Sequence, residues 1–219
     1  MIKTLSLIKR RPDLGRDDFR KHYELVHAPL ALPHMTGLIR YVRYHIDEDL
    51  EGILDPQAGV GFDVLSAFWY RDAESTAQMM ETLQGEAGKP LLADELTFMD
   101  KPANTFFPVS ERMLVKGEEG DEHVWVLVRK PEGMSRYDAS ARLAGEYLPK
   151  LLERLEGVEF ALLRDAFPID GGELRYNAVL QVRAEHVGGL ENWSLGVREA
   201  GFSVTAVRTT RHETDLSTT

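Results

Sequence analysis

The spacing of apolar residues in the first half of the chain predicts two helices among four strands. A β-prone run opens the chain, and an amphipathic helix follows with the apolar stripe Phe19, Tyr23, Val26 and Leu30. The expected strands are 2–8, 38–46, 62–70 and 96–99, and the second helix is expected at 72–84. This β-α-β-β-α-β order is that of a ferredoxin-like unit.

The second half of the chain shows the same order of patterns. Strands are expected at 123–128, 158–163, 174–182 and 202–209, with helices at 135–155 and 185–200. Pro29 and Pro149 lie 120 residues apart at equivalent points, and so do Gly37 and Gly157. We therefore expect an internal duplication, with one ferredoxin-like repeat at 1–110 and a second, diverged repeat at 111–219.

The two repeats together predict an α+β fold. A four-stranded sheet with both helices on one side leaves its other face uncovered, and that face needs a partner. Two such antiparallel sheets in one chain can pack into a single-chain α/β barrel. We expect alternate strand residues to line a cavity between the sheets, where a small molecule could bind.

Composition narrows the classes of function. The chain is 43% hydrophobic and 28% charged, has a formal net charge of -10, and contains no cysteine. The acidic balance disfavours nucleic acid and membrane surfaces as partners, and the missing cysteines exclude disulfides and thiolate chemistry. The first apolar run is too short for a signal sequence or a membrane span, so we expect a cytoplasmic protein.

Two histidines stand close together on the first predicted helix. His22 and His27 are five residues apart, which on an α-helix places them about 140° apart and argues against a shared metal ion. His22, at the edge of the apolar stripe, is interpreted as a packing residue. His27 lies one turn after Tyr23 and just before Ala28-Pro29, where it could turn into a cavity or cap the helix end.

Two strands carry further candidates. On 38–46, alternation places Tyr41, Arg43 and His45 on one face, which is polar enough to line the cavity between the sheets. On the next strand Asp63 and Trp69 share a face, where they could orient a histidine and form an apolar wall. The alternative is that Asp63 starts the strand at a loop and Trp69 fills the core.

These segments resemble a known family. The run IKTLSLIKRRPDLGRDDFRKHYELVHAPLA, followed by RYVRYHI and FDVLSAFWYRDAES, resembles the EthD family of the dimeric α/β-barrel superfamily over about residues 1–105. The most specific element is His27-Ala28-Pro29. The second half resembles the family only in element order and in its proline and glycine positions, so the chain looks like a tandem version of a dimeric barrel.

The resemblance implies acid–base chemistry by histidine on enolisable small molecules. It assigns the family's helix histidine to His27, its strand histidine to His45, and its D-x5-W pattern to Asp63 and Trp69. With the offset of 120, His27 corresponds to Tyr147 in the second half, so we expect one site rather than two.

We therefore expect a cofactor-independent enzyme of isomerase, cyclase or dehydratase type that acts on a hydrophobic, carbonyl-bearing substrate. His27 and His45 would transfer protons, Asp63 would hold a tautomer, and Tyr23, Tyr41 and Trp69 would contact the substrate. The alternative is a non-catalytic binding or accessory protein that holds an apolar metabolite, and haem held by a histidine is a third possibility. The chain would be a monomer with an internal pseudo-dimer, or a homodimer.

Overall fold

The computed structural model describes residues 1–50, 61–154, 156–169, 173–186 and 189–216. In this part of the chain eight strands hydrogen-bond in the order β1-β3-β2-β8-β5-β7-β6-β4, a closed antiparallel barrel. The predicted α+β barrel is therefore confirmed. The chain divides into two compact units: the first holds 1–45, 61–108 and 212–216, and the second holds the described residues of 46–211 outside that set. The repeat boundary expected at 110 stays a prediction.

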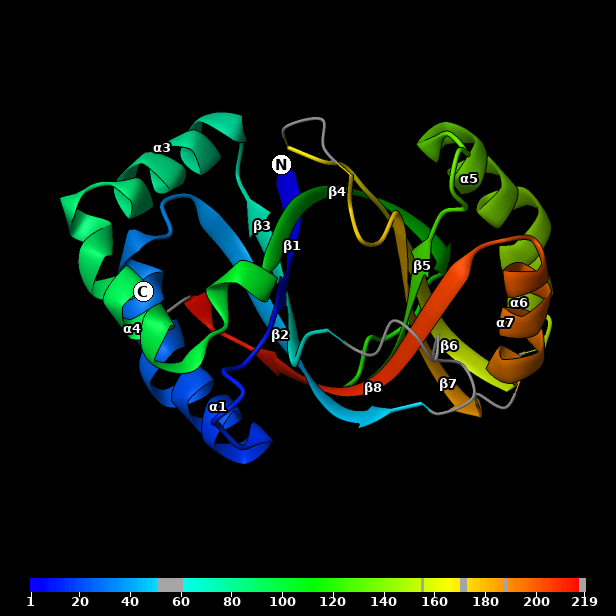
Figure 1. Ribbon diagram of the computed structural model, residues 1–219, viewed down its shortest axis with the longest axis horizontal. Coiled ribbons are helices and arrows are strands. Elements are labelled where there is room, and N and C mark those ends of the chain that lie inside the picture. Colours follow the sequence, from blue (N-terminus) through cyan, green and yellow to red (C-terminus); the bar gives the residue numbers. More distant parts are fainter. Residues whose placement is uncertain (51–60, 155, 170–172, 187–188, 217–219) are drawn as a thin grey trace. The chain divides into compact units, whose positions relative to one another are not determined.

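The first unit has the predicted order of helices and strands. Its strands are β1 (Ile2–Ile8), β2 (Leu38–Asp49), β3 (Val64–Tyr70) and β4 (Thr105–Val115), of which β2 and β4 continue into the second unit. Its helical segments are α1 (Arg16–His22), η1 (Tyr23–His27), α2 (Ala28–Ala31), η2 (Leu32–His34), α3 (Ala73–Gln84), η3 (Glu86–Gly88), α4 (Lys89–Phe98) and η4 (Lys101–Ala103). The helices α1, α3 and α4 lie on one side of β1, β2 and β3 (Figure 1).

The second unit repeats this plan. It contains β5 (Glu122–Arg129), α5 (Arg136–Arg142), η5 (Leu143–Tyr147), α6 (Leu148–Leu152), β6 (Glu156–Ala166), β7 (Ala178–His186), α7 (Gly189–Glu199) and most of β8 (Ser203–Glu213). Ser135 caps α5, because its hydroxyl accepts a hydrogen bond from the Asp138 N–H at 3.1 Å. The helices α5, α6 and α7 cover one face of the sheet (Figure 1), and Val126, Leu151 and Leu180 form part of the apolar core between them.

A π-helical turn interrupts the first helix, where the sequence pattern assumed an α-helix throughout. In η1 the Ala28 N–H bonds to the Tyr23 carbonyl, five residues earlier. In an α-helix the ring of Pro29 would clash with the carbonyl of Leu25, and a wider turn relieves that contact. Ala28 has helical dihedrals of φ -61° and ψ -45°, so the helix continues through Pro29 and His27 does not cap a helix end. The same turn precedes Pro149, where Leu148 N–H bonds to the Leu143 carbonyl.

The wide turn changes which side chains face the sheet. Phe19 and Tyr23 are buried as predicted, but Val26 is 46% exposed because the added residue per turn rotates it outward. His27 and Ala28 are buried in its place. The predicted apolar stripe is therefore wrong beyond Tyr23.

The predicted strand at 96–99 is also wrong, because most of it is the end of α4. The fourth strand is β4, which pairs with β1 through Thr105–Pro108. Pro90 lies in the first turn of α4, where a proline costs no helix hydrogen bond, and Leu91 and Phe98 are its buried residues. A short apolar run such as Leu96–Met99 does not by itself distinguish a strand from a helix end.

Candidate functional site

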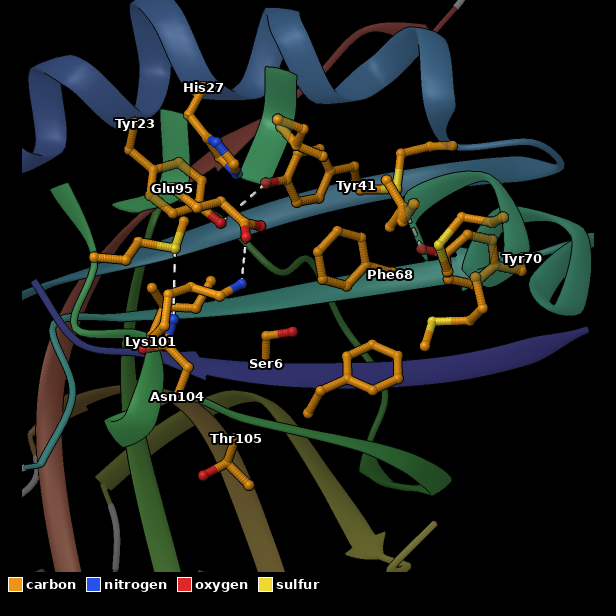
Figure 2. A pocket seen from close by; sticks show the side chains of 18 residues that line it. Ser6, Tyr23, His27, Tyr41, Phe68, Tyr70, Glu95, Lys101, Asn104 and Thr105 are labelled. Carbon is orange, nitrogen blue, oxygen red and sulfur yellow. Dashed lines mark hydrogen bonds and ion pairs between the residues drawn. The ribbon is translucent and has the colours of Figure 1, made fainter. Parts of the chain in front are cut away.

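A cavity of about 340 Å³ lies inside the first unit, between the helices and the sheet. Its polar lining includes His27, Tyr23 and Tyr41, together with Ser6 and Glu95. Figure 2 shows His27 pointing from its helix into this space, with Glu95, Lys101 and Asn104 toward one end and Phe68 and Tyr70 toward the other. Cavities of this size hold small organic molecules.

The sheet side of the cavity is a row of aromatic rings. Tyr41 and Phe68 are stacked, with ring centroids 4.6 Å apart and planes inclined by 13°. Phe68 and Tyr70 follow at 6.2 Å and 16°. Methionine side chains add adaptable apolar surface to the lining; they are Met35, Met79, Met80 and Met99. The cavity is therefore suited to a flat, largely apolar ligand.

His27 forms the polar centre of the cavity. Its Nδ1 lies 2.9 Å from Asp94 Oδ2. A carboxylate can only accept, so Nδ1 carries the hydrogen and Nε2 has the lone pair. Burial lowers the pKa of His27 below its ordinary value and outweighs the hydrogen bond to Asp94 and the charge of Glu95, which raise it. At neutral pH the ring is thus neutral, and its Nε2 has no hydrogen-bond partner among the described residues.

His22 binds the same carboxylate. Its Nε2 lies 2.8 Å from Asp94 Oδ1, and both histidine rings contact Phe98, at 4.4 Å for His22 and 5.0 Å for His27. The expected 140° separation was wrong because it assumed an α-helix. In a π-helical turn, residues five apart come round to the same side. His22 packs as predicted, and it also belongs to the His27 site.

Tyr23 and Tyr41, both named from the sequence, belong to one chain of hydrogen-bonded hydroxyl groups. Tyr41 Oη donates to Tyr23 Oη at 3.2 Å, and Tyr23 Oη lies 3.0 Å from Ser66 Oγ. Burial raises the pKa of both tyrosines, so the hydroxyls keep their protons. Tyr23 and Tyr41 both line the cavity, and their contact with a substrate stays a prediction.

His45 belongs to a separate ionic cluster. Its Nε2 lies 2.6 Å from Glu24 Oε1, and Arg43 donates two hydrogen bonds to the same carboxylate at 2.8 and 2.6 Å. Burial opposes the charge of Glu24, but the hydrogen bonds from His45 and Arg43 outweigh it and lower its pKa to about 2. His45 touches the ring of Tyr23 at 5.8 Å, yet it is not among the side chains that line the cavity.

The strand face carrying these residues was assigned to the wrong side of the sheet. Tyr41, Arg43 and His45 were expected on the face away from the helices, but their partners Tyr23 and Glu24 come from η1. Polar groups on the helix satisfy them, so a polar strand face does not have to turn away from a helix.

Asp63 and Trp69 lie outside the cavity lining as well. Asp63 Oδ2 accepts the backbone N–H of Arg10 at 3.0 Å, and its carboxylate pairs with the side chains of Lys9 and Arg10. Asp63 thus fixes the β1 end, and Asp94 takes the expected role of orienting a histidine. Trp69 alternates with Phe68 and Tyr70 along β3, and the guanidinium of Arg40 covers its ring at 4.7 Å.

Several polar residues of the cavity were not found from the sequence. Glu95 and Lys101 form an ion pair, Asn104 Oδ1 accepts the Lys9 N–H at 2.8 Å, and Ser6 has no hydrogen-bond partner among the described residues. Asp94 and Glu95 lie on α4. Because 96–99 was expected to form a strand, the sequence did not predict the helix that places these two residues next to His27 and the cavity. Within the described ranges, no group of three or more His, Asp or Glu side chains is arranged to hold a metal ion, and no helix is long and apolar enough to cross a membrane.

Comparison with known proteins identifies the domain and the fold. The model of the EthD domain matches residues 11–102. An anthrone oxidase-like protein has a similar structure with a TM-score of 0.59, 11% identity, and coverage of 97% of this chain and 92% of its own. A proposed monooxygenase from Fusobacterium nucleatum follows at a TM-score of 0.53 and 8% identity, over 98% and 94% of the two chains.

A shorter solved protein has higher sequence identity. An EthD family protein from Bacillus halodurans is 24% identical over 49% of this chain and 96% of its own, with a TM-score of 0.35. No curated protein matches the chain in sequence. The two solved structures with TM-scores above 0.5 establish a shared fold, and the chemistry has to be argued from the cavity itself.

Proposed function

We propose that this chain, whose residues 11–102 are an EthD domain, moves a proton on a flat, largely apolar, carbonyl-bearing small molecule bound in the cavity of its first unit. One observation carries the proposal. A buried, neutral histidine is held by Asp94 through Nδ1 and lies in the wall of an aromatic cavity. This is the arrangement that a general base requires.

The reaction step needs only the residues present. His27 Nε2 would take a proton from the carbon next to the carbonyl group, and the C–H electron pair would move to the carbonyl oxygen to form an enolate. The Asp94 carboxylate would stabilise the resulting imidazolium. The imidazolium would then return the proton to the enolate oxygen or to another carbon. The balance is a tautomerisation, which is also the first stage of many isomerisations, dehydrations and cyclisations.

The negative charge that develops on the enolate oxygen requires a hydrogen-bond donor. Tyr41 lines the cavity, but its hydroxyl already donates to Tyr23. Ser6 and Lys101 are better placed, because both line the cavity and Lys101 carries a positive charge next to Glu95. Donors act more strongly in a partly buried cavity than in water. His45 would support the site indirectly, by holding Glu24 on the helix that carries His27.

The substrate class follows from the lining. Stacked rings on one side and methionines in the wall favour a fused aromatic ketone over a small aliphatic one. Anthrone is a suitable probe because it is a flat tricyclic ketone with acidic methylene hydrogens. The name of the anthrone oxidase-like neighbour, which shares only the fold, is consistent with this choice.

The test is loss of deuterium from the methylene carbon of labelled anthrone in ordinary water under nitrogen, followed by mass spectrometry. We expect the protein to accelerate this loss, and H27Q to reduce the acceleration by about 10²- to 10⁴-fold. D94N should reduce it less, because the base remains but its cation is no longer stabilised. H34Q is the matched control, since His34 lies on η2 and not in the cavity lining.

Two results would overturn the catalytic proposal. One is saturable binding of anthrone without any faster loss of deuterium, which would leave the cavity as a binding site for apolar molecules. The other is an unchanged rate in H27Q, which would assign the base to another group.

A further inference from the structure

One carboxylate serves two histidines in the first unit. Asp94 accepts from His27 through Oδ2 at 2.9 Å and contacts His22 through Oδ1 at 2.8 Å. The side chain of His27 is 6% exposed and that of His22 is 30% exposed. The carboxylate therefore links a histidine in the cavity wall to a histidine that is partly open to solvent.

The backbone is built for this arrangement. His22 is the last residue of α1 and His27 is the last of η1, and the π-helical turn between them brings both rings to the same side. Phe98, one turn after Asp94 on α4, contacts both rings and fixes their planes. A purely α-helical segment would point the two side chains apart.

We propose that His22 is a positioning residue for His27: it fixes the Asp94 carboxylate, and by taking a proton from solvent it weakens His27 as a base. A single carboxylate can balance one positive charge. When His22 is protonated, Asp94 is already neutralised, and a second proton on His27 leaves one positive charge uncompensated in a buried place. A positive charge on His22 therefore weakens the binding of a proton by His27. The catalytic consequence of this coupling rests on the proposed function, but the coupling itself does not.

No other charged group near His27 links it to His22 in the described part of the chain. The titratable groups around His27, apart from His22, are Asp94 and Glu95 of α4, Lys101 of η4, Tyr23 of η1 and Tyr41 of β2. Glu95 is paired with Lys101, and both tyrosines keep their protons. Among these titratable groups, Asp94 is the one that forms hydrogen bonds with both imidazoles.

Two variants separate the charge of His22 from its hydrogen bond. H22Q retains a donor for Asp94 Oδ1 but cannot be protonated, whereas H22K provides a permanent cation. The ring resonances of His27 are followed by NMR against pH in the ligand-free protein. We expect His27 to bind its proton about three- to tenfold more tightly in H22Q than in the unmodified protein, and about three- to tenfold more weakly in H22K.

A structural role alone would not produce this order. If His22 only fills space against Phe98, then H22Q and H22K should shift the titration of His27 equally or not at all, and the inference is wrong. H22F tests the positioning part, because it keeps a ring against Phe98 but cannot bind Asp94. We expect H22F to lower the rate of deuterium loss from anthrone several-fold relative to H22Q, which still binds Asp94.

The two proposals can fail separately. If the unmodified protein does not accelerate deuterium loss, the proposed function fails. The order of the His27 titrations among the His22 variants still decides the role of His22. With deuterium loss present and the same titration in all variants, the proposed function stands and the coupling is overturned.

Discussion

The two units share a π-helical turn but differ in the side chains that pack against it. Both have a π-helical turn just before a proline, at η1 with Pro29 and at η5 with Pro149. In the first unit the turn presents His27 to Asp94 and a cavity. In the second it presents Tyr147, whose hydroxyl accepts a hydrogen bond from Arg142 at 3.2 Å. Residues five apart meet in both units, so the turn is scaffold and the side chains decide the chemistry.

The sheet faces under the two turns differ in the same way. At the offset of 120, Ser6 corresponds to Val126 and Tyr41 to Ala161, and the second member of each pair lies in the apolar core of the second unit. Tyr23 likewise corresponds to Leu143, which is buried in that core. Polar and aromatic side chains accompany a cavity in one unit, while small and aliphatic ones pack closely in the other. A few substitutions on a repeated frame thus distinguish a site from a core.

The largest expected effect comes from exchanging the residues at the two turns. H27Y places the residue of the second unit in the first and removes the base, so we expect the acceleration of deuterium loss from anthrone to fall by about 10²- to 10⁴-fold, or about 3–5 kcal/mol in activation free energy. Mass spectrometry of the anthrone methylene measures it.

The reverse exchange is the matched control. Y147H should create no second activity, because Trp193 Nε1 donates to the Tyr147 carbonyl at 2.7 Å and the described residues around it form a packed apolar core. A double variant H27Y/Y147H that regains the rate would contradict the view that the surroundings, and not the histidine alone, make the site.

A second exchange tests the sheet faces. V126S removes apolar volume from a fully buried position and adds a hydroxyl that needs a partner, so we expect the free energy of unfolding to fall by about 2–4 kcal/mol. Ser6 faces the cavity, so S6V should change the free energy of unfolding by about 1 kcal/mol or less and should weaken the binding of anthrone. Urea unfolding and a binding titration measure the two quantities. Equal destabilisation by both variants would remove the distinction between core and cavity wall.

These contrasts also show what the sequence could predict. Most strands and the barrel followed from the alternation of apolar residues and from the repeated proline and glycine positions. His27, Tyr23 and Tyr41 were expected in one site and all line the same cavity, but Asp94 was missed because a short run at the end of α4 fits a strand as well as a helix.

The π-helical turn explains the other errors. Spacing was counted at 3.6 residues per turn, so His22 was separated from His27 and Val26 was placed in the core. A backbone that widens for one turn leaves no periodic signal in a single sequence, although a proline at the same place in both halves was a hint. His45 and Asp63 were assigned from strand alternation and from the resemblance to the EthD family, and only the structure shows that Glu24 and Arg10 bind them.

Acid should go on destabilising the first unit below pH 4, where the second unit has already lost the contribution of His123, because burial lowers the pKa of that histidine from 6.5 to about 4. The pKa of Glu24 is lowered from an ordinary value of 4.5 to about 2, so its stabilisation is present above pH 4.5 and is lost as pH falls toward 2. Burial lowers the pKa of His45, which adds a loss of the same sign below its ordinary value of 6.5. The Glu24 shift corresponds to about 3 kcal/mol.

Hydrogen exchange followed by mass spectrometry measures this loss. Amides of 38–45 should go on losing protection between pH 4.5 and pH 3, after correction for intrinsic rates, whereas the loss for 122–129, a strand that contains His123, should be largely complete by pH 4. E24Q should be less stable at pH 6, because Arg43 then lies buried without its carboxylate, and should lack the acid-dependent loss. Parallel loss of protection in both ranges would assign the acid sensitivity elsewhere.

The smallest effect should come from the proline that both units share. P29A removes the ring that clashes with the Leu25 carbonyl, so the helix can return to α geometry and draw His27 away from Asp94. We expect a several-fold lower rate of deuterium loss from anthrone, with the free energy of unfolding changed by about 1 kcal/mol or less. P149A relaxes the same turn in the second unit and should leave the rate unchanged. If P29A keeps the His27 Nδ1 hydrogen bonded to Asp94 by NMR, tertiary packing around Phe98 holds the turn, and the proline does not cause it.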